Sequence, residues 1–179
     1  MSTDNTVSVI MENIKDDKRF SAVINMERKY ALRNIYDGIK IISSDDEDII
    51  VTVDGDDWLT SDFALEKVSK VYEEKRCLIT YGSFIEWPSG RTHAALMSAY
   101  PNHVLENCLF RDVEWKASHL RTFKKKLWDR IELRDLKDPK TNDFYEVAWD
   151  LSFMYPMLEM AGTRSEYIPE TLYTYNKEN

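Results

Sequence analysis

The chain has 179 residues, of which 43% are hydrophobic and 31% are charged, and its formal net charge is −8 at pH 7. Chains of this length can form one domain with a sizeable core, because they bury roughly 70% of the surface that the unfolded chain exposes. The composition excludes a disordered or collagen-like protein. The acidic charge argues against a nucleic-acid binder, because contacts with phosphates require a basic surface.

The sequence also bears on where the protein works. The opening residues, MSTDNT, lack the basic and apolar regions of a secretory signal. No apolar run approaches the roughly 20 residues that span a bilayer. Cys77 and Cys108 form neither a metal-binding spacing nor a disulfide framework. We therefore expect free thiols, no transmembrane segment and a cytoplasmic location.

Helices and strands alternate in the first half of the chain, as in an α/β sheet joined by crossover helices. Apolar residues at helical spacing predict helices over residues 7–14, 32–39 and 62–72. Runs rich in apolar residues predict strands over 20–24, 49–53 and 78–87. The start of the first helix can be capped by Ser2, Thr3 or Asp4.

The second half is less regular. It predicts a helix over 122–131 and another over 145–160, which Pro156 should bend or interrupt and Gly162 should end. The residues expected to face inward from the longer helix are Ala148, Leu151, Tyr155 and Leu158. Short strands are expected over 167–168 and 172–175.

Residues 49–59 read IIVTVDGDDWL, an apolar strand that runs directly into three carboxylates. Gly55 permits a tight turn, so Asp54, Asp56 and Asp57 should cluster at the carboxyl end of the strand, where ligands of open α/β sheets usually bind. Clustered carboxylates repel one another unless a cation or hydrogen bonds neutralise them. Two interpretations follow: a divalent-metal site that holds a diphosphate, or a solvated acidic turn with an Asp helix cap.

Four segments in order resemble the inverting glycosyltransferases of family 2, which have the GT-A fold. STDNT is similar to the end of the family's Asp-Asp-Gly-Ser-Thr-Asp loop, and RFSAVIN with KYALRNIYDGI is similar to its next strand, asparagine loop and helix. DGDDWL resembles the DxD element. The acceptor-side half is matched by SHLRTF, FYEVAWDLSFMYPMLEMAG and YIPETLYTYN.

The resemblance implies an α/β fold with a mixed sheet flanked by helices, as in nucleotide-diphospho-sugar transferases. The whole chain, 1–179, would be one domain, in which 1–60 is the remainder of the nucleotide-binding half and 61–179 is the acceptor-side half. Met1 stands where the family has the residues before Ser-Thr-Asp, so we expect an N-terminally truncated domain without its first strand, first helix and most of its second strand. Tyr30 stands where the family often has glycine.

The resemblance also implies roles for the acidic residues. Asp56 would be a metal ligand, with Asp54 reaching the donor's ribose, the metal or a metal-bound water, and the ion would be Mn²⁺ or Mg²⁺. Asp57 would cap a helix or support the metal ligands, and we expect Trp58 to lie in the core. Asp150 stands where the family has its general base; without the family it would be interpreted as a capping or salt-bridged residue.

Several basic and polar residues are candidates for donor binding. Asn25 lies in the asparagine loop, and Lys29, Arg33 and Asn34 lie close to where a diphosphate would bind. His119 and Arg121 are further candidates; the alternative for His119 is a structural histidine. The basic residues Arg121, Lys124, Lys125, Lys126 and Arg130 fall on the predicted helix over 122–131 or beside it, where we expect a solvated face rather than a phosphate or membrane contact.

The leading hypothesis is a metal-dependent, inverting glycosyltransferase. It would move a sugar from a UDP- or GDP-sugar to a carbohydrate or other hydroxyl acceptor. The alternative is a non-catalytic, truncated fragment that binds a partner or completes its sheet by forming a homo-oligomer, since an open sheet exposes unpaired backbone. A third hypothesis is a phosphate-transfer enzyme that uses the same carboxylates.

Overall fold

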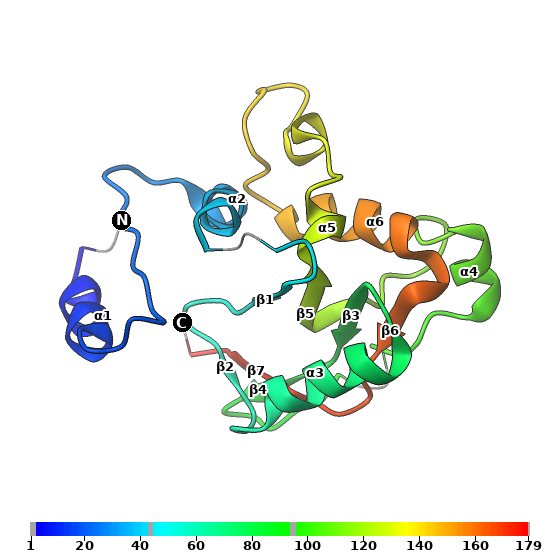
Figure 1. The fold of residues 1–179 in the computed structure, drawn as a ribbon, viewed down its shortest axis with the longest axis horizontal. Coiled ribbons are helices and arrows are strands. Elements are labelled where there is room, and N and C mark those ends of the chain that lie inside the picture. The colour runs from blue at the N-terminus through cyan, green and yellow to red at the C-terminus, as the bar shows by residue number, and fades with distance from the viewer. Residues whose placement is uncertain (1–2, 43–44, 94–95, 179) are drawn as a thin grey trace.

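The computed structural model describes residues 3–42, 45–93 and 96–178 and contains two sheets with helices packed around them (Figure 1). The helices are α1 (Thr6–Ile14), α2 (Tyr30–Ile42), α3 (Ala64–Lys75), α4 (Asn102–Asn107), α5 (Lys125–Trp128) and α6 (Trp149–Ala161), with 3-10 turns η1 (Leu133–Leu136) and η2 (Gly162–Arg164). The strands are β1 (Ile49–Thr52), β2 (Trp58–Leu59), β3 (Ile79–Gly82), β4 (Phe84–Trp87), β5 (Ser118–Lys124), β6 (Ser165–Tyr167) and β7 (Tyr173–Asn176).

The larger sheet is mixed and has the strand order β1-β5-β3-β6. β5 runs antiparallel to both of its neighbours, whereas β6 is parallel to β3. The smaller sheet has the order β2-β7-β4. In the larger sheet Thr52, the last residue of β1, pairs with Arg121 of β5, so the acidic turn after β1 begins beside that arginine. The predicted α/β fold with a mixed sheet flanked by helices is confirmed.

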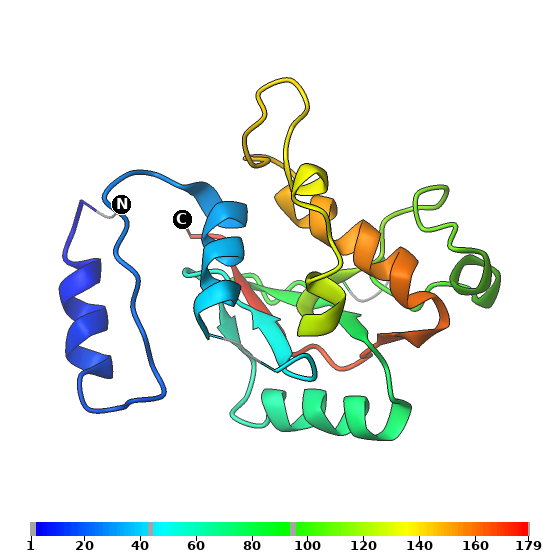
Figure 2. The same cartoon turned by 45° about the horizontal axis from the view of Figure 1, so that its top comes forward.

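Two apolar clusters lie on opposite faces of the larger sheet. On one face the sheet packs against α2, α5 and α6, where the Trp128 ring stacks on Phe123 at 5.7 Å between centroids. On the other face α3 packs through Val68 and Tyr72. Figure 2 shows this layering, with α3 beneath the sheet and α2, α5 and α6 above it. Sheet and helices together hold the end of β1 and the start of α6 in place.

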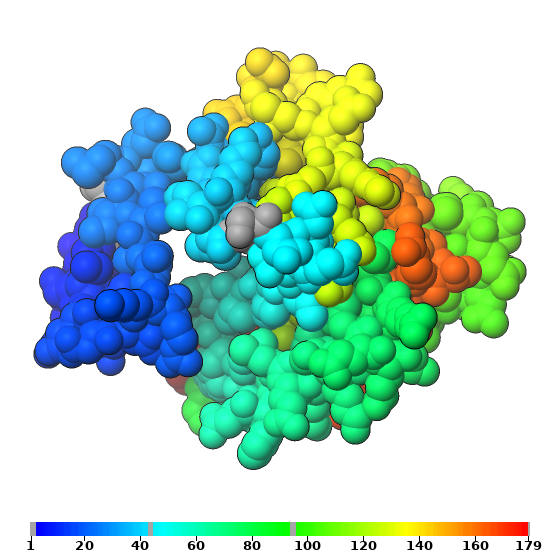
Figure 3. All heavy atoms as spheres, viewed as in Figure 1, coloured from blue at the N-terminus to red at the C-terminus, as the bar shows by residue number. Residues whose placement is uncertain are grey.

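The predicted first helix is present, but the predicted strand over 20–24 is wrong. Residues 20–25 form no regular structure, and no described strand pairs with them. A strand needs a hydrogen-bonded neighbour, and Phe20 and Ile24 are instead 57% and 54% exposed. Of the predicted caps, Asp4 accepts a hydrogen bond from the Thr6 N–H at 3.0 Å; Ser2 lies outside the described residues. Figure 3 shows this first segment as a lobe beside α2, with an opening between it and the rest of the molecule.

The helix predicted over 122–131 is mostly wrong, because residues 122–124 end β5 and only Lys125–Trp128 form α5. β5 lies between two strands and is buried along nearly its whole length, so pairing and burial in the sheet override the helical spacing that begins at Phe123. Predicted residues 78–87 form two strands that belong to different sheets, β3 and β4. The strands predicted near 167 and 172–175 are present as β6 and β7.

The long helix predicted over 145–160 begins later, at Trp149, and Pro156 lies inside α6 without interrupting it. Its buried face also differs from the predicted one: of the four residues expected inward only Leu158 is buried, and the core side is formed by Phe153, Met154, Met157, Leu158 and Ala161. Apolar residues surround this helix on several sides, so spacing alone did not identify the core side. Phe63, predicted to face inward from the third helix, is 65% exposed, because α3 begins only at Ala64 and Phe63 is its N-cap residue.

Both cysteines are free, as predicted. In the described parts of the chain, none of the helices is both long and apolar enough to cross a membrane.

Candidate functional site

The acidic turn after β1 is closed by hydrogen bonds. The Asp57 N–H donates to the Asp54 carbonyl oxygen at 3.1 Å. The Tyr173 hydroxyl accepts from the Asp54 N–H at 3.1 Å and donates to Asp57 Oδ2 at 2.7 Å, and the Asn176 N–H donates to Asp57 Oδ1 at 2.8 Å. Asp57 is therefore held by β7, so it is not a helix cap. A side chain at Gly55 would meet no atom within 4 Å, so packing does not require glycine there.

The surroundings of the Asp54 carboxyl group raise its pKa. Burial raises the pKa of Asp54, the positive charge of Arg121 opposes this rise, and the carboxylates of Asp57, Asp56 and Asp150 add to it. Its charged form is thus disfavoured by desolvation and by like charges. A bound cation would relieve both costs.

Arg121 connects this turn to α6. It is 6% exposed, and its Nη2 donates to Asp150 Oδ2 at 2.7 Å. Its Nε is buried and has no hydrogen-bond partner within the described residues. Burial lowers the pKa of Arg121, while the negative charges of Asp150 and Asp54 raise it. The prediction of a solvated basic face is therefore wrong for Arg121, which lies in the interior between the two acidic groups.

Asp150 lies in the first turn of α6, where a carboxylate interacts favourably with the helix dipole. Its side chain is 22% exposed and forms the ion pair with Arg121. The structure thus has the salt-bridged aspartate that the sequence alone suggested, and it places that aspartate beside the acidic turn. Such a position is compatible with the role implied by the family resemblance.

His119 lies two residues before Arg121 in β5, and its Nδ1 is 3.4 Å from Arg121 Nη1. Its ring stacks on Tyr173 at 4.3 Å between centroids and meets the edge of Phe84 at 5.7 Å. Burial and the charge of Arg121 lower the pKa of His119 to about 2. The imidazole is therefore neutral near pH 7 and adds no positive charge to a phosphate site.

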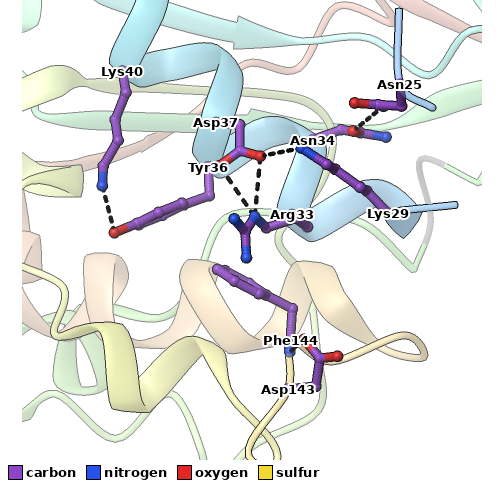
Figure 4. Close-up of polar contacts among 9 residues, drawn as sticks. All are labelled: Asn25, Lys29, Arg33, Asn34, Tyr36, Asp37, Lys40, Asp143 and Phe144. Carbon is purple, nitrogen blue, oxygen red and sulfur yellow. Dashed lines mark hydrogen bonds and ion pairs between the residues drawn. The ribbon is translucent and has the colours of Figure 1, made fainter. Parts of the chain in front are cut away.

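The remaining predicted donor residues form a separate cluster at the start of α2 (Figure 4). Lys29 Nζ lies 3.1 Å from Asp37 Oδ2, and Arg33 Nε lies 3.0 Å from the same oxygen. Asn25 Nδ2 donates to Asn34 Oδ1 at 2.7 Å. Figure 4 shows Arg33 between Asp37 and the ring of Phe144, 5.1 Å from its guanidinium carbon to the ring centroid. The hydrogen bonds described here join these residues to one another rather than to the acidic turn.

Tyr30 begins α2 with a φ of 56°, in the left-handed region that favours glycine. This conformation gives a physical reason why a glycine suits the position, as the family resemblance suggested. The Arg28 guanidinium carbon lies 4.6 Å from the Tyr30 ring centroid, so the side chain is packed rather than displaced.

Trp58, expected in the core, is 42% exposed, and its ring meets Trp87 at 6.1 Å between centroids. The interpretation of Trp58 as a core residue is therefore wrong.

A groove of about 830 Å³ lies along α6, but it is lined by Leu151, Tyr155 and Glu159, whereas Asp150 is directed toward Arg121. Helical periodicity places these lining residues on the side of α6 away from Asp150.

The described residues contain no group of three or more His, Cys, Asp or Glu side chains arranged to hold a metal ion. Asp57 does not complete such a group, because its two oxygens are bound to β7. Mg²⁺ is typically held by only one or two carboxylates together with substrate phosphates. The carboxylates of Asp54 and Asp56 match this requirement in number and in chemistry.

Sequence reasoning did not identify Tyr173 and Asn176 as site residues. They lie in the segment YIPETLYTYN, which was interpreted as short strands and as part of the acceptor-side half, with no role for either residue. Burial raises the pKa of Tyr173 well above its ordinary value, so its hydroxyl keeps its proton and can donate to Asp57. The only sequence signal for this role is the alternation that places Tyr173 and Tyr175 on one face of the strand.

Comparisons with known proteins agree with this fold. Two solved structures of S. aureus TarS 1–349 are similar in fold. The first has a TM-score of 0.65 at 13% identity and covers 98% of this chain and 49% of the other. The second, in complex with UDP-GlcNAc, has a TM-score of 0.64 at 15% identity and covers 99% and 48%. The chain thus spans about half the length of these structures.

No curated protein matches the chain. The family model "Glycosyl transferase family 2" matches residues 1–136, which include the acidic turn, His119 and Arg121 but end before Asp150 and Tyr173. The match covers well over half of the sequence. The chain therefore belongs to glycosyl transferase family 2.

Proposed function

We propose that this protein transfers a sugar from a nucleotide-sugar donor to a hydroxyl acceptor, with the aid of a divalent metal ion and with inversion at the anomeric carbon. One observation carries the proposal: buried Arg121 joins Asp150 to the end of β1, where Asp54 and Asp56 lie. The family membership and the UDP-GlcNAc bound to a similar fold support a UDP-sugar; a GDP-sugar remains the alternative. A cytoplasmic location remains a prediction.

At the donor end, Asp54 and Asp56 would hold Mn²⁺ or Mg²⁺. The bound ion would act as a Lewis acid that stabilises the charge on the departing diphosphate. Arg121 adds a fixed positive charge beside Asp54. Its Nε is buried and lacks a partner among the described residues. Asn25 and Lys29, which precede α2, and Arg33 and Asn34 within it, together with His119, would contact other parts of the donor.

At the acceptor end, Asp150 would take the proton from the attacking hydroxyl. The new bond forms between the acceptor oxygen and the anomeric carbon as the bond from that carbon to the diphosphate breaks. The nucleoside diphosphate leaves with the electron pair. Arg121 holds Asp150 through Oδ2, which leaves Oδ1 to accept the proton. Attack from the side opposite the diphosphate inverts the configuration.

The test is donor hydrolysis and sugar transfer with Mn²⁺, measured for wild type, Asp56→Asn and Asp150→Asn. We expect Asp56→Asn to lower both reactions about 100-fold or more, because loss of a ligand weakens metal binding. Asp150→Asn should lower transfer by about 100-fold or more, since a general base contributes that much. The control is Asp62→Asn, an exposed acid near the turn. Equal activity of wild type and Asp56→Asn, or no donor binding, would contradict the proposal.

A binding or oligomerising module is favoured by one observation. The first segment exposes an unusual number of apolar side chains: Val9, Ile10, Met11, Phe20, Val23, Ile24 and Met26 are each at least 44% exposed. A groove of about 280 Å³ lies between α1 and residues 22–26. A second copy of the chain is the occupant that this alternative requires, so its test is the oligomeric state.

A further inference from the structure

The hydroxyl of Tyr173 bridges the two ends of the acidic turn. It accepts the Asp54 N–H at 3.1 Å and donates to Asp57 Oδ2 at 2.7 Å. Tyr173 itself is fully buried, and its backbone pairs with Leu59 of β2, just after the turn. A single side chain therefore fixes both the entry and the exit of the segment that carries the acidic residues.

β7 forms a further hydrogen bond to the same turn, through the backbone of Asn176. The Asn176 N–H donates to Asp57 Oδ1 at 2.8 Å, so both oxygens of Asp57 are bound to one strand. Hydrogen bonds to a carboxylate are stronger than those between neutral groups. Asp57 thus acts as an anchor that sets where the backbone of Asp54 and Asp56 lies.

The ring of Tyr173 faces the other half of the site. It stacks on His119, whose Nδ1 lies 3.4 Å from Arg121 Nη1, and Arg121 holds Asp150. Phe84 meets the edge of His119, which limits any movement of the imidazole. The hydroxyl of Tyr173 therefore contacts the donor side, while its ring contacts the residues that lead to Asp150.

We propose that Tyr173 is a positioning residue. It fixes the turn of Asp54–Asp57 relative to Arg121, so that the donor is presented to Asp150 in the correct place. This inference rests on the proposed function. Phenylalanine would fill the same space but would leave a buried N–H and a carboxylate oxygen without their shared partner.

The test compares Tyr173→Phe with Tyr175→Phe. Tyr175 lies two residues further along β7, and its ring also contacts His119, at 6.0 Å between centroids. Each variant loses one tyrosine hydroxyl, but only Tyr173 joins the turn. We expect Tyr173→Phe to raise the donor's Kd about tenfold in the presence of Mn²⁺, the size of effect expected from one lost hydrogen bond of about 1.4 kcal/mol. Tyr175→Phe should change it less than twofold.

A second measurement needs no donor. Hydrogen exchange of the Asp54 amide should be about tenfold faster in Tyr173→Phe than in wild type or Tyr175→Phe, because its acceptor is gone. Faster exchange with unchanged donor affinity would overturn the positioning role. Unchanged exchange would overturn the contact itself. If wild type binds no donor while exchange responds as expected, the proposed function is wrong, but the hydrogen bond from the Asp54 N–H to the Tyr173 hydroxyl is confirmed.

The hydrogen bond between Tyr173 and Asp57 allows a further check. Asp57→Asn keeps the shape of the side chain, and it replaces the test if Tyr173→Phe does not fold. Where both fold, the double variant should raise the Kd by less than the product of the two single effects, because both variants remove the same interaction. Fully multiplicative effects would show that Tyr173 and Asp57 act separately and would overturn the inference.

Discussion

At the scale of single residues, Arg121 is the side chain on which the site depends most. It is buried in an ion pair with Asp150, and burying such a pair requires the removal of water from both charges, so replacing both partners with hydrophobic residues would cost less than keeping them. Its partner Asp150 and its neighbour Asp54 explain why a cation is present there. The arrangement favours function over the stability of the unliganded protein.

Arg121→Met tests this dependence. Methionine keeps the apolar volume but leaves Asp150 without its cation, so we expect the free energy of unfolding to fall by about 3 kcal/mol and activity to be lost. Urea denaturation at pH 7 measures the first and donor hydrolysis the second. Arg130→Met, at an exposed arginine of the same segment, is the control and should change stability by less than about 0.5 kcal/mol. Equal stability losses in the two variants would show that the buried ion pair contributes no more to the free energy of unfolding than an exposed arginine does.

At the scale of elements, Asp37 of α2 forms ion pairs with Lys29, which precedes the helix, and with Arg33 in its first turn. Burial alone would raise the pKa of Asp37, but hydrogen bonds and charges from Arg33 and Lys29 hold it below its ordinary value of 3.8. A carboxylate whose pKa is lower in the folded state adds stability above its unfolded pKa and loses it as the pH falls through the folded value.

Asp37→Asn should therefore destabilise the protein at pH 7, by about 1 kcal/mol for two partly exposed ion pairs, and should have little effect below pH 3. Denaturant unfolding at several pH values measures this difference. Glu106→Gln, at an exposed glutamate of α4, is the control and should leave the pH profile of stability as in wild type. A constant effect of Asp37→Asn from pH 3 to pH 7 would contradict the ion-pair explanation.

Elements also show what the sequence could and could not predict. The alternation of helices and strands was sufficient to predict an α/β fold, and the carboxylates after β1 were sufficient to predict the acidic turn, whereas the mixed sheet was predicted from the family resemblance. Residues 122–124, the end of β5, were predicted as the start of a helix because Phe123 fits a period of 3.6 with apolar residues that follow it, and their burial between β1 and β3 is a tertiary effect. The role of Tyr173 depends on a contact between residues 116 positions apart, which local patterns do not reveal.

At the scale of the whole molecule, apolar exposure is uneven. The first segment holds many of the exposed large hydrophobic residues, whereas the side chains around α6 and β5 are well packed. An exposed apolar surface of this kind is typical of a surface that meets another macromolecule. The oligomeric state in solution therefore discriminates between the two candidate functions.

Sedimentation velocity of wild type and of the double variant Val23→Ser, Ile24→Ser makes this test. If the first segment binds a second copy, wild type should sediment as a dimer or larger species and the double variant as a monomer, with little change in Tm because both side chains are more than half exposed. Leu133→Ser, at an exposed leucine of η1, is the control. A monomeric wild type with micromolar donor affinity would exclude the oligomerising module.

The anchoring of Asp57 by β7 has a consequence for protein synthesis. Its two carboxylate oxygens accept hydrogen bonds from Tyr173 and Asn176, which follow Asp57 in the sequence by 116 and 119 positions. During translation, a nascent chain whose segment from β1 to α6 has left the ribosome still lacks these partners. Its acidic turn is then without the hydrogen bonds from β7. Competence to bind a substrate should consequently arise only after β7 has emerged and docked.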